Sequence, residues 1–339
     1  MRTILIAPLC LAAWLPACSN PPSAVVDTAV IPQSPSLRGL SRVDPQIAWV
    51  SGSAGSVARS LDSGQTWELL RVPETAELDF RDVHAFSASS AVLMSAGPAE
   101  ASRLYRTEDS GASWQLIATN HEPQGFWDGI AFWDKQHGLL VGDPVQGCLT
   151  VMTTEDGGRS WTTVPPTALP AAVEGEFAFA ASGTSLAVQP GGLAWIATGG
   201  SVARVYRSTD YGSSWAAVDT PIKAASEGAG IFSIAFRDPQ HGVVVGGDYT
   251  KPDQREANAA YTQDGGLTWS AVTAGQEPGG YRSGCSWHKG KRTWIAVGPS
   301  GADFSTDDGR TWAPLASDGF HSVDQEWASA WAGRVGRLR

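Results

Sequence analysis

Six aspartates recur in one sequence pattern, and a row of carboxylates could serve as general acids, general bases or metal ligands. The pattern is Ser/Thr-x-Asp-x-Gly-x-x-Trp, and its aspartates are Asp62, Asp109, Asp156, Asp210, Asp264 and Asp307. Aspartate accepts backbone N–H bonds in tight turns, glycine adopts the positive φ that such turns need, and tryptophan can cover the following hairpin. We therefore interpret the six aspartates as structural, and we predict no catalytic residue and no metal site.

A second recurring set places cationic and aromatic side chains at matching points of the repeats. Aligned unit by unit, these points hold Arg38, Arg81, Trp127, Arg282 and His321, and the next position holds Asp82 or Asp128. Guanidinium groups bind carboxylates through two parallel hydrogen bonds. If the fold brings these residues together, they form a site for the carboxylate of a protein or peptide partner, or of an acidic sugar. The alternative is that the arginines pair with neighbouring acids and brace the fold.

The repeats consist of short segments typical of β-strands. Successive aspartates of the pattern are 47, 47, 54, 54 and 43 residues apart. Between them lie an aromatic-led segment such as Ile231-Phe232-Ser233, a second segment that ends in glycine such as Trp195-Ile196-Ala197-Thr198-Gly199, and a third such as Val205-Tyr206-Arg207. With the strand that begins at the tryptophan of the pattern, each repeat has four strands, which is typical of a β-propeller blade.

The two ends of the chain predict the number of blades. After the sixth pattern, Phe320-His321-Ser322 opens another unit, and the chain ends where a seventh pattern would begin. The apolar run at residues 24–31 can supply the missing outer strand, which would remove the open sheet edge. The sequence therefore predicts an all-β, seven-bladed β-propeller with N-terminal strand closure, with six or eight blades as alternatives. The second set of residues would then lie at one mouth of the central channel.

The N-terminus resembles a bacterial export signal. Arg2 precedes an apolar stretch, and Leu15-Pro16-Ala17-Cys18 resembles a lipobox, in which the cysteine is lipidated. We predict a signal peptide at residues 1–18, a tether and closing strand at residues 19–35, and the propeller at residues 36–339. Ser19 favours the outer membrane, so a periplasmic lipoprotein is expected, with plain secretion as the alternative.

Charge and cysteine content narrow the classes of partner and cofactor. The net charge of −10 argues against nucleic acid, whose phosphates need a basic surface. No long apolar run follows the signal, so we expect membrane association through the lipid alone, and a monomer. Cys148 and Cys285 fall three blades apart, too far for a disulfide, which predicts free thiols. No Gly-x-Gly-x-x-Gly follows a strand and no Cys-x-x-Cys occurs, so no cofactor is predicted.

The repeats are similar to the Asp-box (BNR) repeat of sialidases and other propellers. Over roughly residues 36–339 the chain resembles the photosystem II stability and assembly factor family and its bacterial relatives. The resemblance rests on the Asp-box, on the aromatic-led opening such as Phe80-Arg81-Asp82, and on His-Gly-x-x-Val-Gly, present as His137–Gly142 and His241–Gly246. It implies a non-enzymatic scaffold that assists the assembly of membrane complexes.

A glycan-active enzyme, sialidase-like or another glycosidase or lyase, is the alternative function on the same fold. The Phe/Tyr-Arg-Ile-Pro motif of sialidases is absent from the sequence. Other glycosidases need two carboxylates at a fixed separation, and a sequence alone does not show such a pair.

Overall fold

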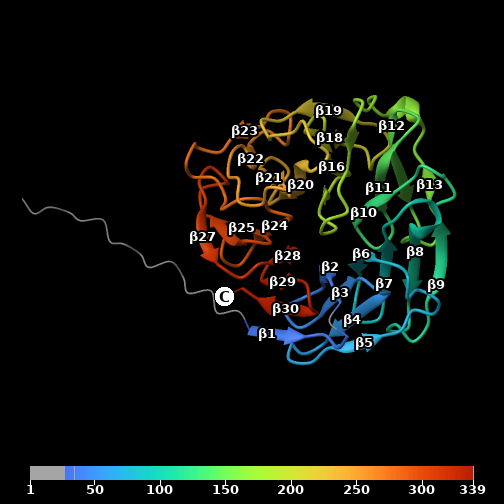
Figure 1. The fold of residues 1–339 in the computed structure, drawn as a ribbon. Coiled ribbons are helices and arrows are strands. Elements are labelled where there is room, and N and C mark those ends of the chain that lie inside the picture. The colour runs from blue at the N-terminus through green and yellow to red at the C-terminus, as the bar shows by residue number, and fades with distance from the viewer. Residues whose placement is uncertain (1–26, 34, 339) are drawn as a thin grey trace, which may run out of the picture.

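The computed structural model describes residues 27–33 and 35–338 of the chain. Seven antiparallel sheets surround a central channel, and the chain passes once around the ring, from blue to red in Figure 1. The fold is an all-β, seven-bladed β-propeller, which confirms the prediction, and the six- and eight-bladed alternatives are wrong. The predicted signal peptide, Cys18 and the start of the tether lie outside the described residues.

Four strands make up each blade, and the first strand of each lies nearest the channel. Blades 1 and 2 contain β2 (Leu37–Arg42), β3 (Ala48–Gly52), β4 (Ser56–Ser60) and β5 (Glu68–Leu70), then β6 (Phe80–Ala85), β7 (Ala91–Ser95), β8 (Arg103–Thr107) and β9 (Gln115–Thr119). Blades 3 and 4 contain β10 (Trp127–Phe132), β11 (Gly138–Val145), β12 (Cys148–Thr154) and β13 (Thr162–Thr163), then β15 (Leu186–Gln189), β16 (Leu193–Ala197), β18 (Arg204–Ser208) and β19 (Ala216–Asp219).

The remaining three blades complete the ring. Blade 5 contains β20 (Ala229–Phe236), β21 (Gly242–Asp248), β22 (Ala259–Thr262) and β23 (Ser270–Ala271), and its sheet is extended by β17 (Gly199–Gly200) and β14 (Glu176–Phe177). Blades 6 and 7 contain β24 (Gly284–His288), β25 (Thr293–Gly298), β26 (Gly301–Ser305) and β27 (Ala313–Ala316), then β28 (Ser322–Asp324), β29 (Trp327–Ser329), β30 (Arg334–Arg337) and β1 (Asp27–Val30). Two short 3-10 helices, η1 (Ala99–Ala101) and η2 (Pro166–Ala168), interrupt the loops.

The N-terminal strand closes the ring, as predicted. β1 pairs with β30 in antiparallel register from Asp27↔Arg337 to Val30↔Arg334, so blade 7 is built from both ends of the chain. Ile31, which follows β1, is fully buried, and its backbone N–H donates to the carbonyl of Gly333 at 2.7 Å. The closing strand therefore contributes apolar burial as well as hydrogen bonds.

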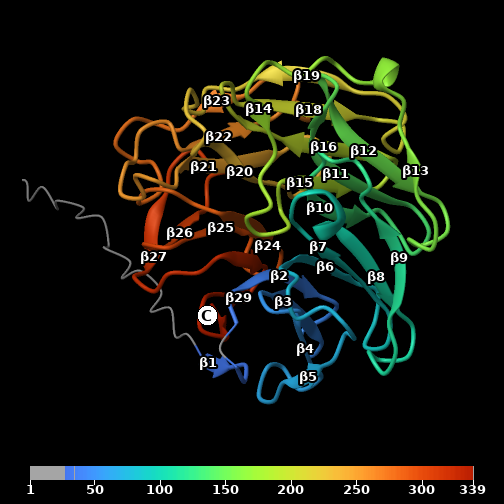
Figure 2. The same ribbon diagram turned by 45° about the vertical axis from the view of Figure 1, so that its right-hand side comes forward.

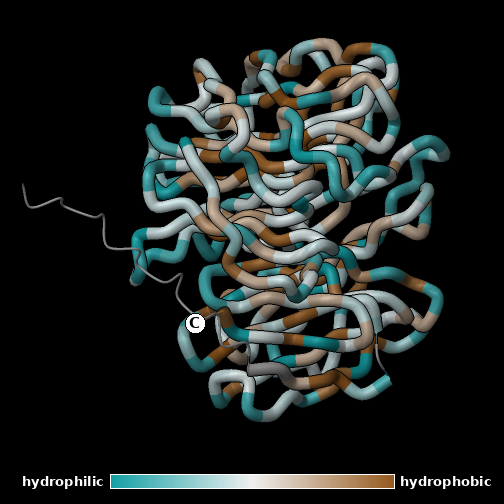
Figure 3. The backbone as a smooth tube through the Cα atoms, turned by 60° about the vertical axis from the view of Figure 1, so that its left-hand side comes forward, coloured by the Kyte–Doolittle hydropathy of each residue, from teal (hydrophilic) through white to brown (hydrophobic). Residues whose placement is uncertain are grey.

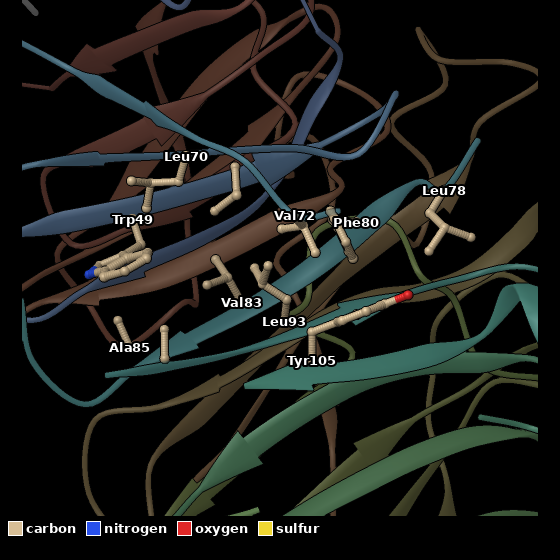
Figure 4. Packing of buried hydrophobic residues seen from close by; sticks show 11 residues of the cluster. Trp49, Leu70, Val72, Leu78, Phe80, Val83, Ala85, Leu93 and Tyr105 are labelled. Atoms are coloured by element: carbon tan, nitrogen blue, oxygen red, sulfur yellow. The ribbon is translucent and has the colours of Figure 1, made fainter. Parts of the chain in front are cut away.

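The core lies between neighbouring blades. Trp49 from β3, Phe80 from β6 and Leu93 from β7 are fully buried in one cluster between blades 1 and 2 (Figure 4). Burial of one such side chain stabilises the fold by roughly 2–3 kcal/mol. Figure 3 shows hydrophobic segments mainly in the interior of the molecule and hydrophilic segments mainly at its outer bends. Each blade thus depends on its neighbours for most of its apolar contacts.

The two cysteines of the described part of the chain agree with the sequence-based prediction. Cys148 and Cys285 are both free thiols. Within the described part of the chain, no helix is long and apolar enough to cross a membrane.

Candidate functional site

A cavity of about 410 Å³ opens at one end of the channel. We call it the mouth cavity. Its lining residues come from the innermost strands of blades 1, 2 and 5 and from the loops around them: Arg38, Arg81, Phe179, Ala180, Ala181, Phe232, Tyr249, Tyr281, Ser283, Pro299 and His321. The structure therefore brings together Arg38, Arg81 and His321 from the predicted set.

A recurring β-bulge decides which residue of each inner strand faces this cavity. In β2 and β6 the pairing skips one residue, between Leu37 and Gly39 and between Phe80 and Asp82, so that Arg38 and Arg81 leave the ladder. The same skip occurs in β10 and β20. An unpaired bulge residue re-aims its side chain, and in blades 1 and 2 that side chain is an arginine.

The structure corrects the sequence alignment in blades 3 and 6. In β10 the skipped residue is Asp128, so Trp127 pairs with Gly142 and belongs to a buried cluster between blades 2 and 3. In blade 6 the residue that lines the cavity is Ser283, one position after Arg282. The prediction that Trp127 and Arg282 lie at the mouth is therefore wrong, because Trp127 packs in the core and Arg282 pairs with a buried acid of its own blade.

Three residues that were predicted at the mouth are buried inside the blades instead. Arg282 is 2% exposed, and its Nε donates to Oδ2 of Asp303 at 2.6 Å. Asp82 is also buried, and its two oxygens accept the backbone N–H groups of Val83 at 2.7 Å and Ile130 at 2.8 Å. Asp128 is 1% exposed and does not line the mouth cavity. The bracing alternative therefore describes Arg282, whose partner is Asp303, whereas Asp82 bonds to backbone N–H groups.

The basic side of the mouth cavity is held by backbone carbonyls. Arg38 Nη1 donates to the carbonyl of Ala181 at 3.3 Å, and Arg81 Nη1 donates to that of Ala180 at 3.0 Å. Arg81 Nε also pairs with Asp79 at 2.7 Å, whereas Arg38 has no ion pair among the described residues. Burial and the positive charge of Arg81 lower the pKa of Arg38.

His321 lies beside the two arginines in the mouth cavity and is uncharged, so it can donate or accept a hydrogen bond. Burial, followed by the charges of Arg38 and Arg81, lowers the pKa of His321 to about 3. Its Nε2 lies 3.5 Å from Oγ of Ser36. At neutral pH the cavity therefore carries the charges of two guanidinium groups and no imidazolium charge.

An aromatic wall faces the arginines. The rings of Phe179 and Phe232 stack with centroids 3.7 Å apart, and the ring of Tyr281 meets Phe232 edge-on at 4.7 Å. Tyr249 stands beside them and is 53% exposed. Burial raises the pKa of Tyr281, so its hydroxyl stays protonated. Sequence reasoning missed this wall because Phe179 and Tyr249 lie in loops outside the repeated segments.

The segment that leads into blade 4 contacts both arginines of the mouth cavity and the acid Asp143. The segment 178–182 lies between β14 and β15, where the yellow-green chain turns in toward the centre of the ring (Figure 2). Its Ala178 N–H donates to Asp143 at 3.0 Å, and the hydroxyl of Ser182 donates to the carbonyl of Ser283 at 2.6 Å. Burial raises the pKa of Asp143 to about 6, and burial plus the charge of Asp143 raise that of Asp128.

The six repeated aspartates lie at turns, each with the same hydrogen bonds. In the first repeat, the hydroxyl of Ser60 donates to Asp62 at 2.9 Å and accepts the N–H of Gly64 at 2.8 Å. The other carboxylate oxygen of Asp62 accepts the hydroxyl of Thr66 at 2.6 Å. The pattern glycines all have φ between 80° and 84°. A Ser or Thr directly precedes each tryptophan and donates its hydroxyl to the aspartate, so it also belongs to the repeated pattern.

No protein-family model matches the chain, and no curated protein matches it significantly in sequence. Solved structures do match it. YCF48 from Cyanidioschyzon merolae is 16% identical with a TM-score of 0.62, and the match covers 93% of this chain and 98% of that chain. The WD40 β-propeller domain of Doa1 is 10% identical with a TM-score of 0.60, covering 93% and 97%. An ancestral GH74 enzyme is 15% identical with a TM-score of 0.57, covering 90% of this chain and 41% of that chain. These similarities assign the chain to the β-propeller fold.

Proposed function

We propose that this protein is an exported, non-enzymatic binding module that captures a carboxylate of a protein or peptide partner in the mouth cavity. The observation that carries the proposal is the meeting of Arg38 and Arg81 with an aromatic wall in one cavity of about 410 Å³. A guanidinium group gives a carboxylate two parallel hydrogen bonds, and a buried one is weakly screened by salt.

The two sides of the cavity together define the ligand. A carboxylate between Arg38 and Arg81 lies opposite Phe232 and Tyr281, which offer apolar surface. A peptide C-terminus with an apolar last side chain satisfies both sides at once. An acidic side chain within a loop brings the carboxylate but leaves the aromatic wall without a partner.

The enzyme alternative has less support from the site. None of the described residues that line the mouth cavity is Asp or Glu. Of the nearby acids, Asp79 pairs with Arg81, and Asp143 accepts the backbone N–H of Ala178. A glycosidase needs two carboxylates aimed at the same sugar bond. Turnover of any fluorogenic glycoside or polysaccharide by the purified protein would nevertheless replace the binding proposal.

The cellular role belongs to the same proposal. Lipidation at Cys18 would hold the propeller in the periplasm beside the outer membrane. The resemblance to photosystem II assembly factors and the fold shared with YCF48 support a scaffold role in assembling membrane complexes. The partner would then be a membrane protein with a carboxylate that enters the mouth cavity. One propeller, as a monomer, would bind one such partner.

The proposal is tested with paired peptides. A pool of short peptides with apolar last residues is prepared with free and with amidated C-termini, and binding is followed by fluorescence anisotropy. Free peptides are expected to bind about tenfold more tightly or better, since amidation removes the charge that the arginines recognise. The double variant Arg38→Gln/Arg81→Gln should lose this preference. Arg71→Gln, an exposed arginine outside the cavity, is the matched control. Equal affinity for both peptide forms would refute the proposal.

A further inference from the structure

A second cavity, of about 390 Å³, lies at the opposite end of the same inner strands. We call it the basal cavity. It is lined by residues of blades 1, 6 and 7: Arg42, His288, Lys291, Glu326 and Arg337, with Gly290, Gln325 and Leu338. β2 connects the two sites, because Arg38 near its start lines the mouth cavity and Arg42 at its end lines the basal cavity.

Positive charge exceeds negative charge in the basal cavity, although the whole protein is acidic. Three cationic side chains and one carboxylate line it, which leaves a net charge of +2 at its wall. Asp324 is half-buried and accepts the backbone N–H of Arg42 at 2.8 Å. Lys289, which is exposed in the same turn as Lys291, does not line the cavity. A local excess of this kind in a protein with net charge −10 concentrates anions at one place.

Glu326 fixes the two guanidinium groups without using all their donors. Its Oε1 accepts from Nε of Arg42 and from Nη2 of Arg337, both at 3.2 Å. The two Nη groups of Arg42, and Nε and Nη1 of Arg337, have no acceptor within the described part of the chain. Lys291 has no ion pair there either.

His288 adds a neutral donor. Its Nδ1 accepts the backbone N–H of Lys291 at 3.3 Å, which leaves the proton of the neutral ring on Nε2. Burial, opposed by the charge of Glu326, lowers the pKa of His288, so the neutral ring is the form present at pH 7. The cavity therefore offers N–H donors from four side chains on three blades.

We propose that the basal cavity binds a phosphomonoester group. A phosphomonoester carries a charge near −2 at neutral pH and three strong acceptor oxygens, so it matches several donors that come from different directions. A carboxylate is planar and monovalent, and a single arginine satisfies it. The cavity volume also exceeds that of a phosphate alone and leaves room for the group to which the phosphate is attached.

The phosphate can belong to a soluble compound or to a lipid headgroup. The lipid source is compatible with the path of the chain, since β1 begins at Asp27, which pairs with Arg337. The N-terminal residues that carry the predicted lipid anchor therefore join the propeller beside the basal cavity, on the face opposite the mouth cavity.

The test uses the full propeller and compares two lysines of one turn. Binding of inorganic phosphate and of glycerol 3-phosphate is measured by calorimetry or by NMR titration, with acetate as the monovalent comparison. Lys291→Glu should weaken phosphate binding about tenfold or more, because it reverses a charge in the cavity wall. Lys289→Glu makes the same change in net charge outside the cavity and should weaken binding less than about twofold. The thermal melting temperature shows that both variants are folded.

Vesicles distinguish the two sources of phosphate. Sedimentation with phosphatidylcholine vesicles that contain phosphatidic acid, but not with phosphatidylcholine alone, and loss of sedimentation in Lys291→Glu, supports the lipid headgroup. Binding of soluble phosphates without sedimentation supports a soluble ligand. The proposal is overturned if neither phosphates nor these vesicles bind, if the two lysine variants weaken binding equally, or if an acidic peptide binds at Lys291 and phosphate does not.

Discussion

The carboxylate of Asp82 in blade 2 accepts the backbone N–H of Ile130 in blade 3, with Oδ2 and N 2.8 Å apart. Its other oxygen accepts the N–H of Val83 in its own strand at 2.7 Å. A single buried carboxylate thus joins two neighbouring inner strands beside the channel. Burial raises its pKa from 3.8 to about 7 in spite of both hydrogen bonds.

This pKa predicts how the stability of an Asp82→Asn variant varies with pH. The folded protein holds the Asp82 proton more tightly than the unfolded chain does, so this group contributes most stability below pH 4 and loses its contribution as the pH rises through 7. Relative to the wild type, the free energy of unfolding of Asp82→Asn should rise by about 2–3 kcal/mol between pH 5 and pH 8. Urea denaturation of both proteins across that range measures it. The comparison cancels His84 and His321, whose lowered pKa values act in the opposite direction. Parallel pH profiles would contradict the prediction.

Arg81 and Arg282, which look equivalent in sequence, should differ in their effect on stability. Arg282→Met leaves the buried Asp303 without its partner and should lower the free energy of unfolding by about 3–5 kcal/mol. Arg81→Gln breaks a half-exposed pair with Asp79 and should cost less than about 1 kcal/mol. Denaturant titrations report both values. A double variant that also replaces Asp303 with Leu should recover part of the lost stability. Equal losses for the two arginine variants would contradict the burial of Arg282 and the partial exposure of Arg81.

The repeated aspartates should act on stability and not on binding. Asp307→Ala removes the acceptor for the N–H of Thr311 at 3.0 Å and for its hydroxyl at 2.7 Å. We expect a loss of about 1–2 kcal/mol in the free energy of unfolding, since a typical hydrogen bond contributes about 1 kcal/mol. The exposed Asp253→Ala is the control. Peptide and phosphate affinities should be unchanged in both variants, and a selective loss of either affinity in Asp307→Ala would show that the turn has a further role.

Removing the closing strand should destabilise the ring and expose an edge. A variant that begins at residue 27 retains β1, whereas one that begins at residue 32 loses both the pairing with β30 and the buried Ile31. The shorter variant should melt about 10 °C or more below the longer one. It should also form oligomers, because the freed edge of β30 can pair with another chain. Light scattering and calorimetry on the two variants are sufficient, and identical melting temperatures would show that blade 7 is stable with three strands.

The sequence by itself determined the architecture. Six spaced copies of Ser/Thr-x-Asp-x-Gly-x-x-Trp define the repeat, because a turn of this kind requires a short acceptor, a residue with positive φ and a large apolar cover at fixed separations. The unfinished last repeat and the apolar run near the start together predicted the shared blade. These inferences depend on local geometry and on chain order, both of which a sequence contains.

The tertiary structure alone decided which residues face the channel. A bulge in β2, β6, β10 and β20 shifts the alternation of side chains by one residue, and neither Arg38 nor Arg282 carries a local signal that says which way its side chain points. Hence Arg38 reaches the mouth cavity, whereas Arg282 turns into its blade and meets Asp303. The aromatic wall and the basal cavity likewise combine residues far apart in the chain, such as Arg42 and Lys291. Arg42 and Lys291 come close together because closure of the ring brings the first and last blades together.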